Sequence, residues 1–197
     1  MKITVTNHVS LDGVMQAPAA PDEDPRDGFP FGGWAAPGVD EVIGREMGKG
    51  MGQPGGLLFG RRTYERMSLA WRGRTDNPYT QVLDNATKYV VSTTLTEPLD
   101  WANSVLVREL AQLKQYDGHL TVLGSQDLIQ SLRAEHLIDR YILMIHPLVL
   151  GQGRRLFPDG PRDPLQLVDS VVSTTGVIIA TYEVAPHGVA TYEEASA

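Results

Sequence analysis

Apolar side chains alternate with polar ones at the start of the chain and again in several later segments. In residues 3–9, Ile3, Val5 and Val9 share one face while polar residues share the other, which is the pattern of a half-buried strand. Further short apolar runs predict strands over 55–60, 89–91, 105–107, 120–123, 141–150, 165–172 and 177–184. Apolar residues at helical spacing predict helices over 38–50, 61–69, 79–86, 109–115 and 126–137.

The order of these elements predicts the fold class. A helix between two strands is typical of a parallel crossover, and helices separate most of the earlier strands. The last three strands follow one another without a helix, and the turn at 173–176 joins the final pair. We therefore expect an α/β fold with a mixed, mostly parallel central sheet, antiparallel C-terminal edge strands and flanking helices.

The segment 16–37 interrupts this pattern. It holds five prolines and three glycines, and that spacing allows neither a helix nor a strand ladder. Phe29, Phe31 and Trp34 lie in the same stretch, although a solvated linker seldom needs aromatic side chains. We expect a lid-like loop within one domain over 1–185, followed by a tail over 186–197.

Composition narrows the possible functions. The chain has 197 residues, a formal net charge of -7 and no cysteine. The acidic total argues against a nucleic-acid partner, and the missing cysteines exclude disulfides, thiolate nucleophiles and iron–sulfur clusters. The five histidines show no metal-binding spacing. With no signal peptide or membrane span in the pattern, we expect a cytoplasmic protein without a membrane partner.

Positive charge gathers in one window of this acidic chain. Residues 60–75 contain five arginines and one glutamate, a net charge of +4. Arg61, Arg62 and Thr63 follow Gly60 where a predicted strand gives way to a helix, and helix N-termini favour anions. The sequence therefore predicts an anionic ligand here, whereas the simpler alternative is a glycine turn before a surface helix with solvated arginines.

Two more turns of small or hydroxyl-bearing residues follow predicted strands. Ser92 and Thr93 follow 89–91, while Gly124 and Ser125 follow 120–123 and open a helix that Ser125 is expected to cap. Open α/β sheets bind ligands at the carboxyl ends of their strands. An ordinary helix cap is the alternative for the second turn. Together the three turns predict cofactor-binding residues, which are Gly60, Arg61, Arg62, Thr63, Ser92, Thr93, Gly124, Ser125, Gln126 and Asp127.

Carboxylates are the candidates for acid–base work. Asp12 follows the first predicted strand, and Asp40 and Glu41 lie in the first turn of the helix predicted over 38–50. The alternatives are an Asp-Gly turn for Asp12 and favourable placement near a helix dipole for the other two. His146 lies inside an apolar run and is interpreted as a core residue. The Gly-Gln-Gly at 151–153 is not followed by a helix, so a Rossmann fingerprint is excluded.

Five segments occur in an order that resembles a known superfamily. They are Ser10–Gly13, Leu58–Glu65, Lys88–Ser92, Gly124–Ser125 with Leu128 and Leu132, and Ile145–Gly153 with Leu156 and Phe157. This order resembles the dihydrofolate reductase superfamily, specifically proteins similar to the C-terminal reductase domain of the riboflavin-biosynthesis bifunctional deaminase-reductase. The resemblance implies a dihydrofolate reductase-like three-layer fold and a homodimer.

The resemblance also implies roles for the candidate residues. The segment 60–63 would hold the adenosine end of NADPH, Ser92 would meet the 2′-phosphate region, and the turn at 124–125 would face the pyrophosphate. The loop beginning at Asp12 would lie near the nicotinamide, and the helix with Asp40 and Glu41 would supply the substrate carboxylate. We expect the residues that contact the substrate to include Gly13, Met15 and Trp34.

These observations predict an NADPH-dependent reductase that transfers a hydride to a small heterocyclic or carbonyl substrate, either pterin-like or ribosylaminopyrimidine-like. Hydride transfer asks little of side chains because the cofactor carries the chemistry. Residues 16–41 hold six carboxylates and one arginine, a net charge of -5, which favours a cationic or neutral substrate over a phosphorylated one. Two alternatives are a non-catalytic NADPH- or nucleotide-binding regulatory module and a self-associating structural domain.

Overall fold

A single eight-stranded sheet organises the molecule. The computed structural model describes residues 1–51, 55–160 and 162–185, and the strand order is β4-β3-β2-β5-β1-β6-β8-β7. The strands are β1 Lys2–Ser10, β2 Gly55–Gly60, β3 Thr87–Val91, β4 Ser104–Val107, β5 His119–Leu123, β6 Arg140–His146, β7 Leu165–Val172 and β8 Ile178–Val184. The first six strands in this order, from β4 to β6, are parallel to their neighbours. Strand β8 is antiparallel to both β6 and β7. The predicted mixed sheet is confirmed.

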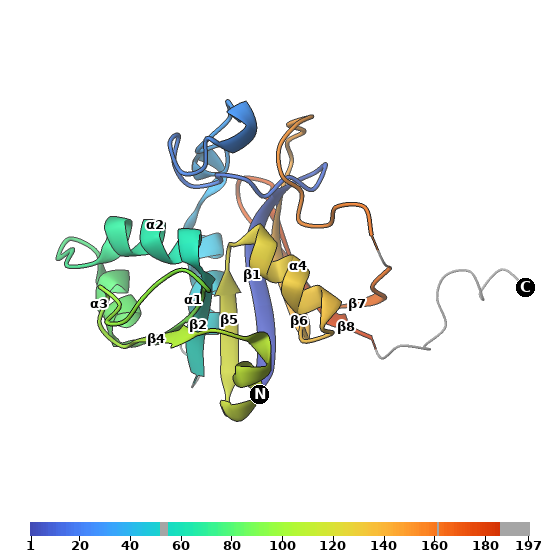
Figure 1. Cartoon of the computed structure of the whole chain (residues 1–197). Coiled ribbons are helices and arrows are strands. Elements are labelled where there is room, and N and C mark those ends of the chain that lie inside the picture. Colours follow the sequence, from blue (N-terminus) through green and yellow to red (C-terminus); the bar gives the residue numbers. More distant parts are fainter. Residues whose placement is uncertain (52–54, 161, 186–197) are drawn as a thin grey trace, which may run out of the picture.

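Helices cover both faces of the sheet (Figure 1). They are α1 Glu41–Met51, α2 Arg61–Trp71, α3 Pro78–Asn85 and α4 Gln126–Ala134, with short 3-10 turns η1 Arg26–Gly28, η2 Ala36–Gly38 and η3 Leu110–Gln115. Helix α4 and η3 pack on one face, while α1, α2 and α3 pack on the other. The three layers follow from the connections, which cover one face of the sheet in the first half of the chain and the other face in the second half.

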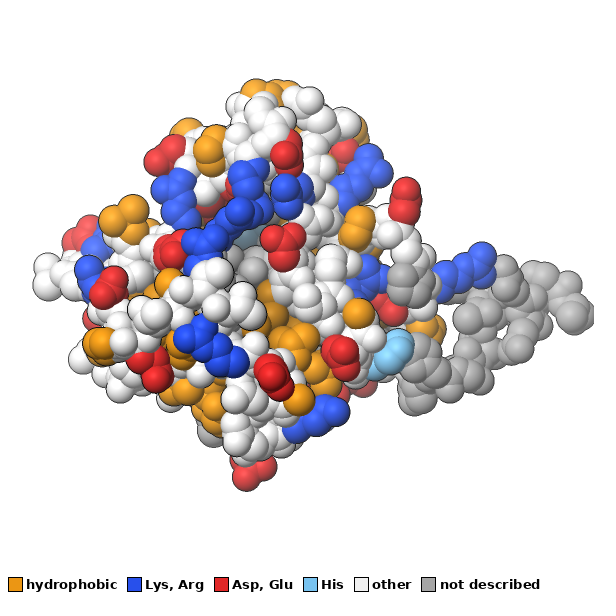
Figure 2. Space-filling model, viewed as in Figure 1, with side chains coloured by type: hydrophobic (Ala, Val, Ile, Leu, Met, Phe, Trp, Pro, Cys, Tyr) orange, Lys and Arg blue, Asp and Glu red, His pale blue; other side chains and the backbone are white. Residues whose placement is uncertain are grey.

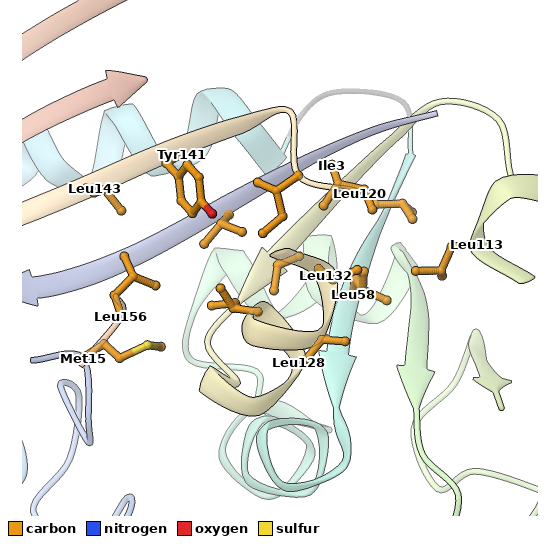
Figure 3. Close-up of a cluster of buried hydrophobic side chains, with 14 of the residues drawn as sticks. Ile3, Met15, Leu58, Leu113, Leu120, Leu128, Leu132, Tyr141, Leu143 and Leu156 are labelled. Atoms are coloured by element: carbon orange, nitrogen blue, oxygen red, sulfur yellow. The ribbon is translucent and has the colours of Figure 1, made fainter. Parts of the chain in front are cut away.

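Strand alternation builds the core on the α4 face. Ile3 and Val5 of β1 are fully buried against Ile129 and Leu132 of α4, and Figure 3 shows this cluster from within. Burial of each such side chain contributes about 1.5–3 kcal/mol. The same cluster reaches Met15 at the upper end of β1, so the start of the 16–37 loop is fixed by the core.

On the opposite face, α1 and α2 pack against different strands. Phe59 of β2 meets Tyr64 of α2, whereas Met144 of β6 meets Ile43 of α1. Lys88 of β3 is fully buried, and its ammonium group donates hydrogen bonds to carbonyls of Leu83, Asp84 and Ala86. Burial lowers the pKa of Lys88 to about 8. These bonds satisfy the C-terminal end of α3 and fix it against β3.

Several predicted boundaries were wrong. The strand predicted over 141–150 ends at His146, because the following Pro147 has no N–H to donate to a ladder. The helix predicted over 109–115 is the 3-10 turn η3. The helix predicted over 126–137 ends at Ala134, and His136 then adopts a positive φ of 51°. The predicted tail at 186–197 lies outside the described residues.

The topology brings opposite crossovers together between β1 and β5. The connection from β1 passes through α1 on one face, and the connection from β5 passes through α4 on the other. Because β1 and β5 are neighbours, their carboxyl ends form the topological switch point at which open α/β sheets bind ligands. The loops that follow β1 and β6 both lie above this end of the sheet (Figure 1).

Within the described residues, no helix is both long and apolar enough to cross a membrane.

Candidate functional site

Three turns lie at the same end of the sheet, at the carboxyl ends of its parallel strands. Strands β3, β2 and β5 are parallel neighbours, so their carboxyl ends at Ser92, Gly60 and Gly124 lie side by side. The structure therefore brings together the three segments that the sequence singled out. The turn after β5 lies at the switch point between β1 and β5, and the turns after β2 and β3 follow it along the same end of the sheet.

The turns after β2 and β5 are in direct contact. A Cβ atom on Gly60 would lie 2.1 Å from Oγ of Ser125, and one on Gly124 would lie 3.3 Å from Cγ2 of Thr63. Gly124 also has a φ of +69°, which disfavours a side chain. Glycine at these positions lets the two turns approach each other closely.

Ser125 does not cap α4 as predicted. Its backbone is left-handed (φ 70°, ψ 76°), and its hydroxyl makes no capping hydrogen bond. The reason is this conformation, which directs the side chain toward Gly60 rather than toward the first turn of α4. Gly60, the N-cap of α2, supplies no side-chain cap either. Both helices therefore begin without a side-chain cap, which suits them to an anionic ligand.

Arginines surround these two helix starts. Arg61 shares its guanidinium with the carboxylate of Glu65 at 3.2 Å, across one turn of α2. Arg62 is exposed and has no partner in the described part of the chain. At exposed positions such pairs are weak and exchange readily, so a phosphate can replace Glu65 as the partner of Arg61 and can bind Arg62 directly.

The turn after β3 is bound to the end of β4. Ser92 accepts hydrogen bonds at its Oγ from the N–H groups of Thr94 and Leu95, and Thr93 is exposed beside it. Arg108 donates from Nη1 to the Ser92 carbonyl at 2.9 Å. Sequence reasoning missed Arg108, although it directly follows the predicted strand 105–107 and so lies at a fourth carboxyl end.

Basic side chains form a band across this side of the molecule, between the loops above and α2 and α4 below (Figure 2). Arg26 of the 16–37 loop and Arg154 of the segment that follows β6 both approach the carboxylate of Asp127, at 3.8 and 3.7 Å. Arg154 also pairs with Asp27 at 3.0 Å. No local pattern predicts this convergence, because the residues are distant along the chain.

The 16–37 loop is packed rather than loose. The Gln16 amide donates to the carbonyls of Asp24 and Arg26 and accepts from the N–H of Arg154. The Trp34 indole N–H donates to the Gln16 carbonyl at 2.7 Å. Phe29 is buried in a small cluster with Val14 and Ala17. The loop therefore has its own core and is held over the end of β1.

Asp12 holds two loops together. Its carboxylate accepts hydrogen bonds from the Ser10 hydroxyl at 2.6 Å and from the N–H groups of Leu150 and Gly151. These bonds, that of Ser10 above all, lower the pKa of Asp12 to about 2. Gly13 follows with a φ of +82°, which lets the chain reverse directly after Asp12.

Asp40 and Glu41 differ in their surroundings. Asp40 caps α1 by accepting from the Ile43 N–H, and it also accepts from the N–H and hydroxyl of Thr174 in the β7–β8 turn. The Thr174 hydroxyl is the main reason why the pKa of Asp40 lies below its ordinary value. Glu41 is exposed and forms no hydrogen bond or ion pair with another described residue.

Two histidines form a buried pair on the α1 face of the sheet. His146 is 3% exposed, which confirms its predicted core position, and its Nε2 lies 2.8 Å from Nδ1 of His8. The Trp34 ring meets His146 edge-on. Burial lowers the pKa of both rings, that of His8 to about 4. The described residues contain no group of three or more His, Asp or Glu side chains that could hold a metal ion.

A cavity of about 480 Å³ lies at the other end of the sheet, around the start of β1 and β6. Its lining includes Arg133 and Asp163, paired at 2.7 Å, and Arg140 and Glu183, paired at 2.6 Å. These charges already bind each other, whereas the turns at the opposite end of the sheet begin two helices without side-chain caps.

Comparison with known proteins gives one family and a consistent fold. The family model of the RibD C-terminal domain matches residues 1–179. YyaP of Bacillus subtilis (strain 168), a protein named as uncharacterized, is 29% identical over 136 residues, which cover 64% of this chain and 72% of YyaP.

Three solved structures share the fold. A protein assigned to riboflavin biosynthesis from Shewanella sp. PV-4 is 23% identical, with a TM-score of 0.63, and the match covers 94% of this chain and 100% of that one. A pyrimidine reductase-like protein from Corynebacterium diphtheriae is 11% identical, with a TM-score of 0.64 over 94% and 92%. Dihydrofolate reductase from Enterococcus faecalis, complexed with NADP(H) and RAB-propyl, is 14% identical, with a TM-score of 0.60 over 94% and 97%. The expected dihydrofolate reductase-like fold is confirmed.

Proposed function

The chain belongs to the RibD C-terminal domain family, and from this premise we propose that it is an NADPH-dependent reductase of a small heterocyclic or carbonyl substrate. The contact between Gly60 and Ser125, beside two helix starts without side-chain caps, is the observation that carries the proposal. Glycine-lined helix starts of this kind are suited to the diphosphate of a dinucleotide.

Each turn has its own part in cofactor binding. The N–H groups at the start of α4, from Gln126 and Asp127 onward, face the pyrophosphate together with Thr63. Arg61 and Arg62 bind the 2′-phosphate by charge-assisted hydrogen bonds. Ser92, Thr93 and the guanidinium of Arg108 border the adenosine end. When bound, the nicotinamide supplies the hydride, and the protein holds it in place.

The carboxylates divide the remaining work. Asp12 and Asp40 each accept three hydrogen bonds that fix neighbouring loops, so we assign them to organising the site. Glu41, whose carboxylate has no such bonds, relays the proton that the reduced substrate needs. Gly13, Met15 and Trp34 border the substrate at the end of β1.

The negative charge of the 16–41 segment favours a substrate without a phosphate group. Six carboxylates and one arginine give it a net charge of -5, which attracts a cationic ring, admits a neutral one and repels a phosphorylated one. A pterin-like heterocycle or a simple carbonyl therefore fits better than a phosphorylated ribosylaminopyrimidine. The regulatory module that binds NADPH without turnover is the second candidate.

We further propose that residues 1–185 form the reductase domain and that the protein is a homodimer. Edge strand β7 exposes Leu167, Val168 and Val172, with exposed fractions of 52%, 46% and 65%. An apolar edge strand of this kind commonly pairs with another copy. Sedimentation equilibrium would give twice the chain mass, and a monomer at all concentrations would contradict the dimer.

The experiment that tests the function measures NADPH oxidation with a panel of pterins and carbonyl compounds, alongside NADPH affinity by calorimetry. The reductase predicts both binding and turnover with at least one member of the panel. Tight binding without turnover across the panel would favour the regulatory module.

A further inference from the structure

Asn7 is a polar residue in an otherwise apolar row. Ile3, Val5 and Val9 share its face of β1, and all four side chains are buried, Asn7 with 6% exposure. Its Nδ2 atom is buried without a hydrogen-bond partner among the described residues. Buried amides are nearly always paired in folded proteins, so an unpaired one calls for an explanation.

The position of Asn7 links this amide to the switch point. The pairing of β1 with β5 ends at Thr6 and Leu123, so Asn7 is the first residue of β1 that extends past β5. One further step of the same parallel register would place Asn7 level with Gly124, in the turn that opens α4. On its other side Asn7 pairs with Leu143 of β6.

The face of β1 on which Asn7 lies is the α4 face. Its register partner Leu143 belongs to the cluster that also holds Met15 and Leu156, as Figure 3 shows. His8 and Trp34 lie on the opposite, α1 face. Asn7 therefore lies on the side of the sheet where α4 begins, and we assign the first N–H groups of α4 to the pyrophosphate of the cofactor.

The chemistry of the amide indicates its ligand. A primary amide offers a donor and an acceptor side by side, and another primary carboxamide complements it with two reciprocal hydrogen bonds. A nicotinamide nucleotide carries one such group, on the reacting ring. The edge of its adenine can also pair with an amide, but the proposed site holds the adenosine half beside Ser92, at the end of β3. Of the groups that the proposed cofactor would bring to this end of the sheet, the carboxamide is the one that matches.

We propose that Asn7 binds the carboxamide of the nicotinamide ring and thereby fixes the rotation of the ring at the end of β1. This rests on the proposed function. The bond would satisfy the buried Nδ2 atom, which has no partner in the described part of the chain, and it would orient the ring before hydride transfer, since small misplacements of the reacting atoms slow the reaction.

The variant Asn7→Leu tests this because leucine is similar in size and cannot form hydrogen bonds. Calorimetry should show NADP⁺ binding about tenfold weaker, the effect of one lost pair of amide hydrogen bonds. Binding of adenosine 2′,5′-bisphosphate, which lacks the nicotinamide, should be unchanged. The melting temperature should not fall, because the variant removes an unpaired buried amide.

Thr4→Val is the matched control. Oγ1 of Thr4 is another buried atom of β1 without a partner, but Thr4 pairs with Arg140 near the start of β6, away from the switch point. Thr4→Val should therefore leave the affinity for NADP⁺ unchanged. An equal loss of NADP⁺ affinity in both variants would overturn the assignment of Asn7.

A second measurement needs no folded variant. In thionicotinamide adenine dinucleotide phosphate, sulfur, a weaker acceptor, replaces the carboxamide oxygen, so the wild-type protein should bind it more weakly than NADP⁺. Equal affinity for the two would overturn the proposal, as would unchanged NADP⁺ affinity in Asn7→Leu. If either result is found while the wild-type protein still binds adenosine 2′,5′-bisphosphate, the proposed cofactor site is supported and only the role of Asn7 is wrong. Binding of neither nucleotide would instead overturn the proposed function, and this proposal with it.

Discussion

Gly60 and Ser125 belong to different turns, yet a Cβ atom on Gly60 would lie 2.1 Å from Oγ of Ser125 and 3.2 Å from its Cβ. The contact joins the end of β2 to the start of α4, across 65 residues of sequence. The contact explains why β2 ends in a glycine, Gly60. The proposed diphosphate site depends on this close approach.

Gly60→Ala should disrupt the contact. The new methyl group would force the Ser125 hydroxyl to rotate away and the two turns to separate by a few tenths of an ångström. We expect NADPH affinity to fall at least about tenfold and stability to fall by about 1–3 kcal/mol, the usual cost of overpacking. Calorimetry and urea unfolding measure the two effects.

A second substitution provides the control. Ser125→Gly removes the atoms that the new methyl group meets, and glycine accepts the left-handed backbone at this position without strain. Gly60→Ala should therefore cost less stability in the Ser125→Gly background than in the wild type. Equal costs in both backgrounds would show that the contact does not constrain Gly60.

Arg61→Ala combined with Arg62→Ala tests the 2′-phosphate assignment. Charge-assisted hydrogen bonds are worth about 1.5–3 kcal/mol, so the affinity for NADPH should fall about 10- to 100-fold while that for NADH changes far less. Arg74→Ala is the matched control, because Arg74 comes from the same basic window but pairs with Asp76. Equal losses of both cofactors would contradict the assignment.

Local patterns predicted the sheet and the three turns because both depend on short-range features. Apolar alternation gave the strands, and a glycine or hydroxyl directly after a strand gave each turn. Arg26 and Arg154 escaped prediction because they approach Asp127 only through the folding of two long loops. The partner of His146 was likewise hidden, since His8 lies 138 residues away on an adjacent strand.

The roles of the carboxylates show the same limit. The sequence identifies Asp12 as a polar residue directly after a strand, but the N–H groups of Leu150 and Gly151 that bind it come from a segment about 140 residues later in the chain. An Asp-Gly turn and a loop-organising carboxylate have the same sequence. Their difference lies in tertiary hydrogen bonds, which no local pattern records.

Gly32→Ala tests whether the packed 16–37 loop matters for function. A Cβ atom on Gly32 would lie 2.2 Å from the carbonyl oxygen of Pro21, a backbone atom that cannot rotate aside. The loop should shift, turnover should change, and stability should fall by about 1–3 kcal/mol. Gly48→Ala, in α1 with no atom within 4 Å of the new Cβ, should instead raise stability by up to about 1 kcal/mol. Unchanged turnover in Gly32→Ala would separate the loop from function.

The buried histidine pair predicts a pH dependence of stability. Burial, with a smaller contribution from His146, lowers the pKa of His8 from 6.5 to about 4. Between these values the unfolded chain binds the proton and the folded protein does not, so stability is full above pH 6.5 and is lost as the pH falls toward 4. The loss is at most about 3 kcal/mol.

Urea unfolding between pH 7.5 and 4.5 measures this effect. The double variant His8→Phe with His146→Phe should show a flatter profile over that range, because the titrating pair is gone. Asp12 contributes in the same direction but only below its ordinary pKa of 3.8, outside the range. Parallel profiles for the wild type and the double variant would show that the pair does not titrate as described.

Calorimetric titration of the wild-type protein with NADPH and with NADH tests the central claim most directly. If the turns at Gly60, Ser92 and Gly124 together bind a phosphorylated nicotinamide nucleotide, NADPH should bind saturably at one site per chain and more tightly than NADH. The absence of binding heat with both nucleotides, confirmed at a second temperature, would contradict the account.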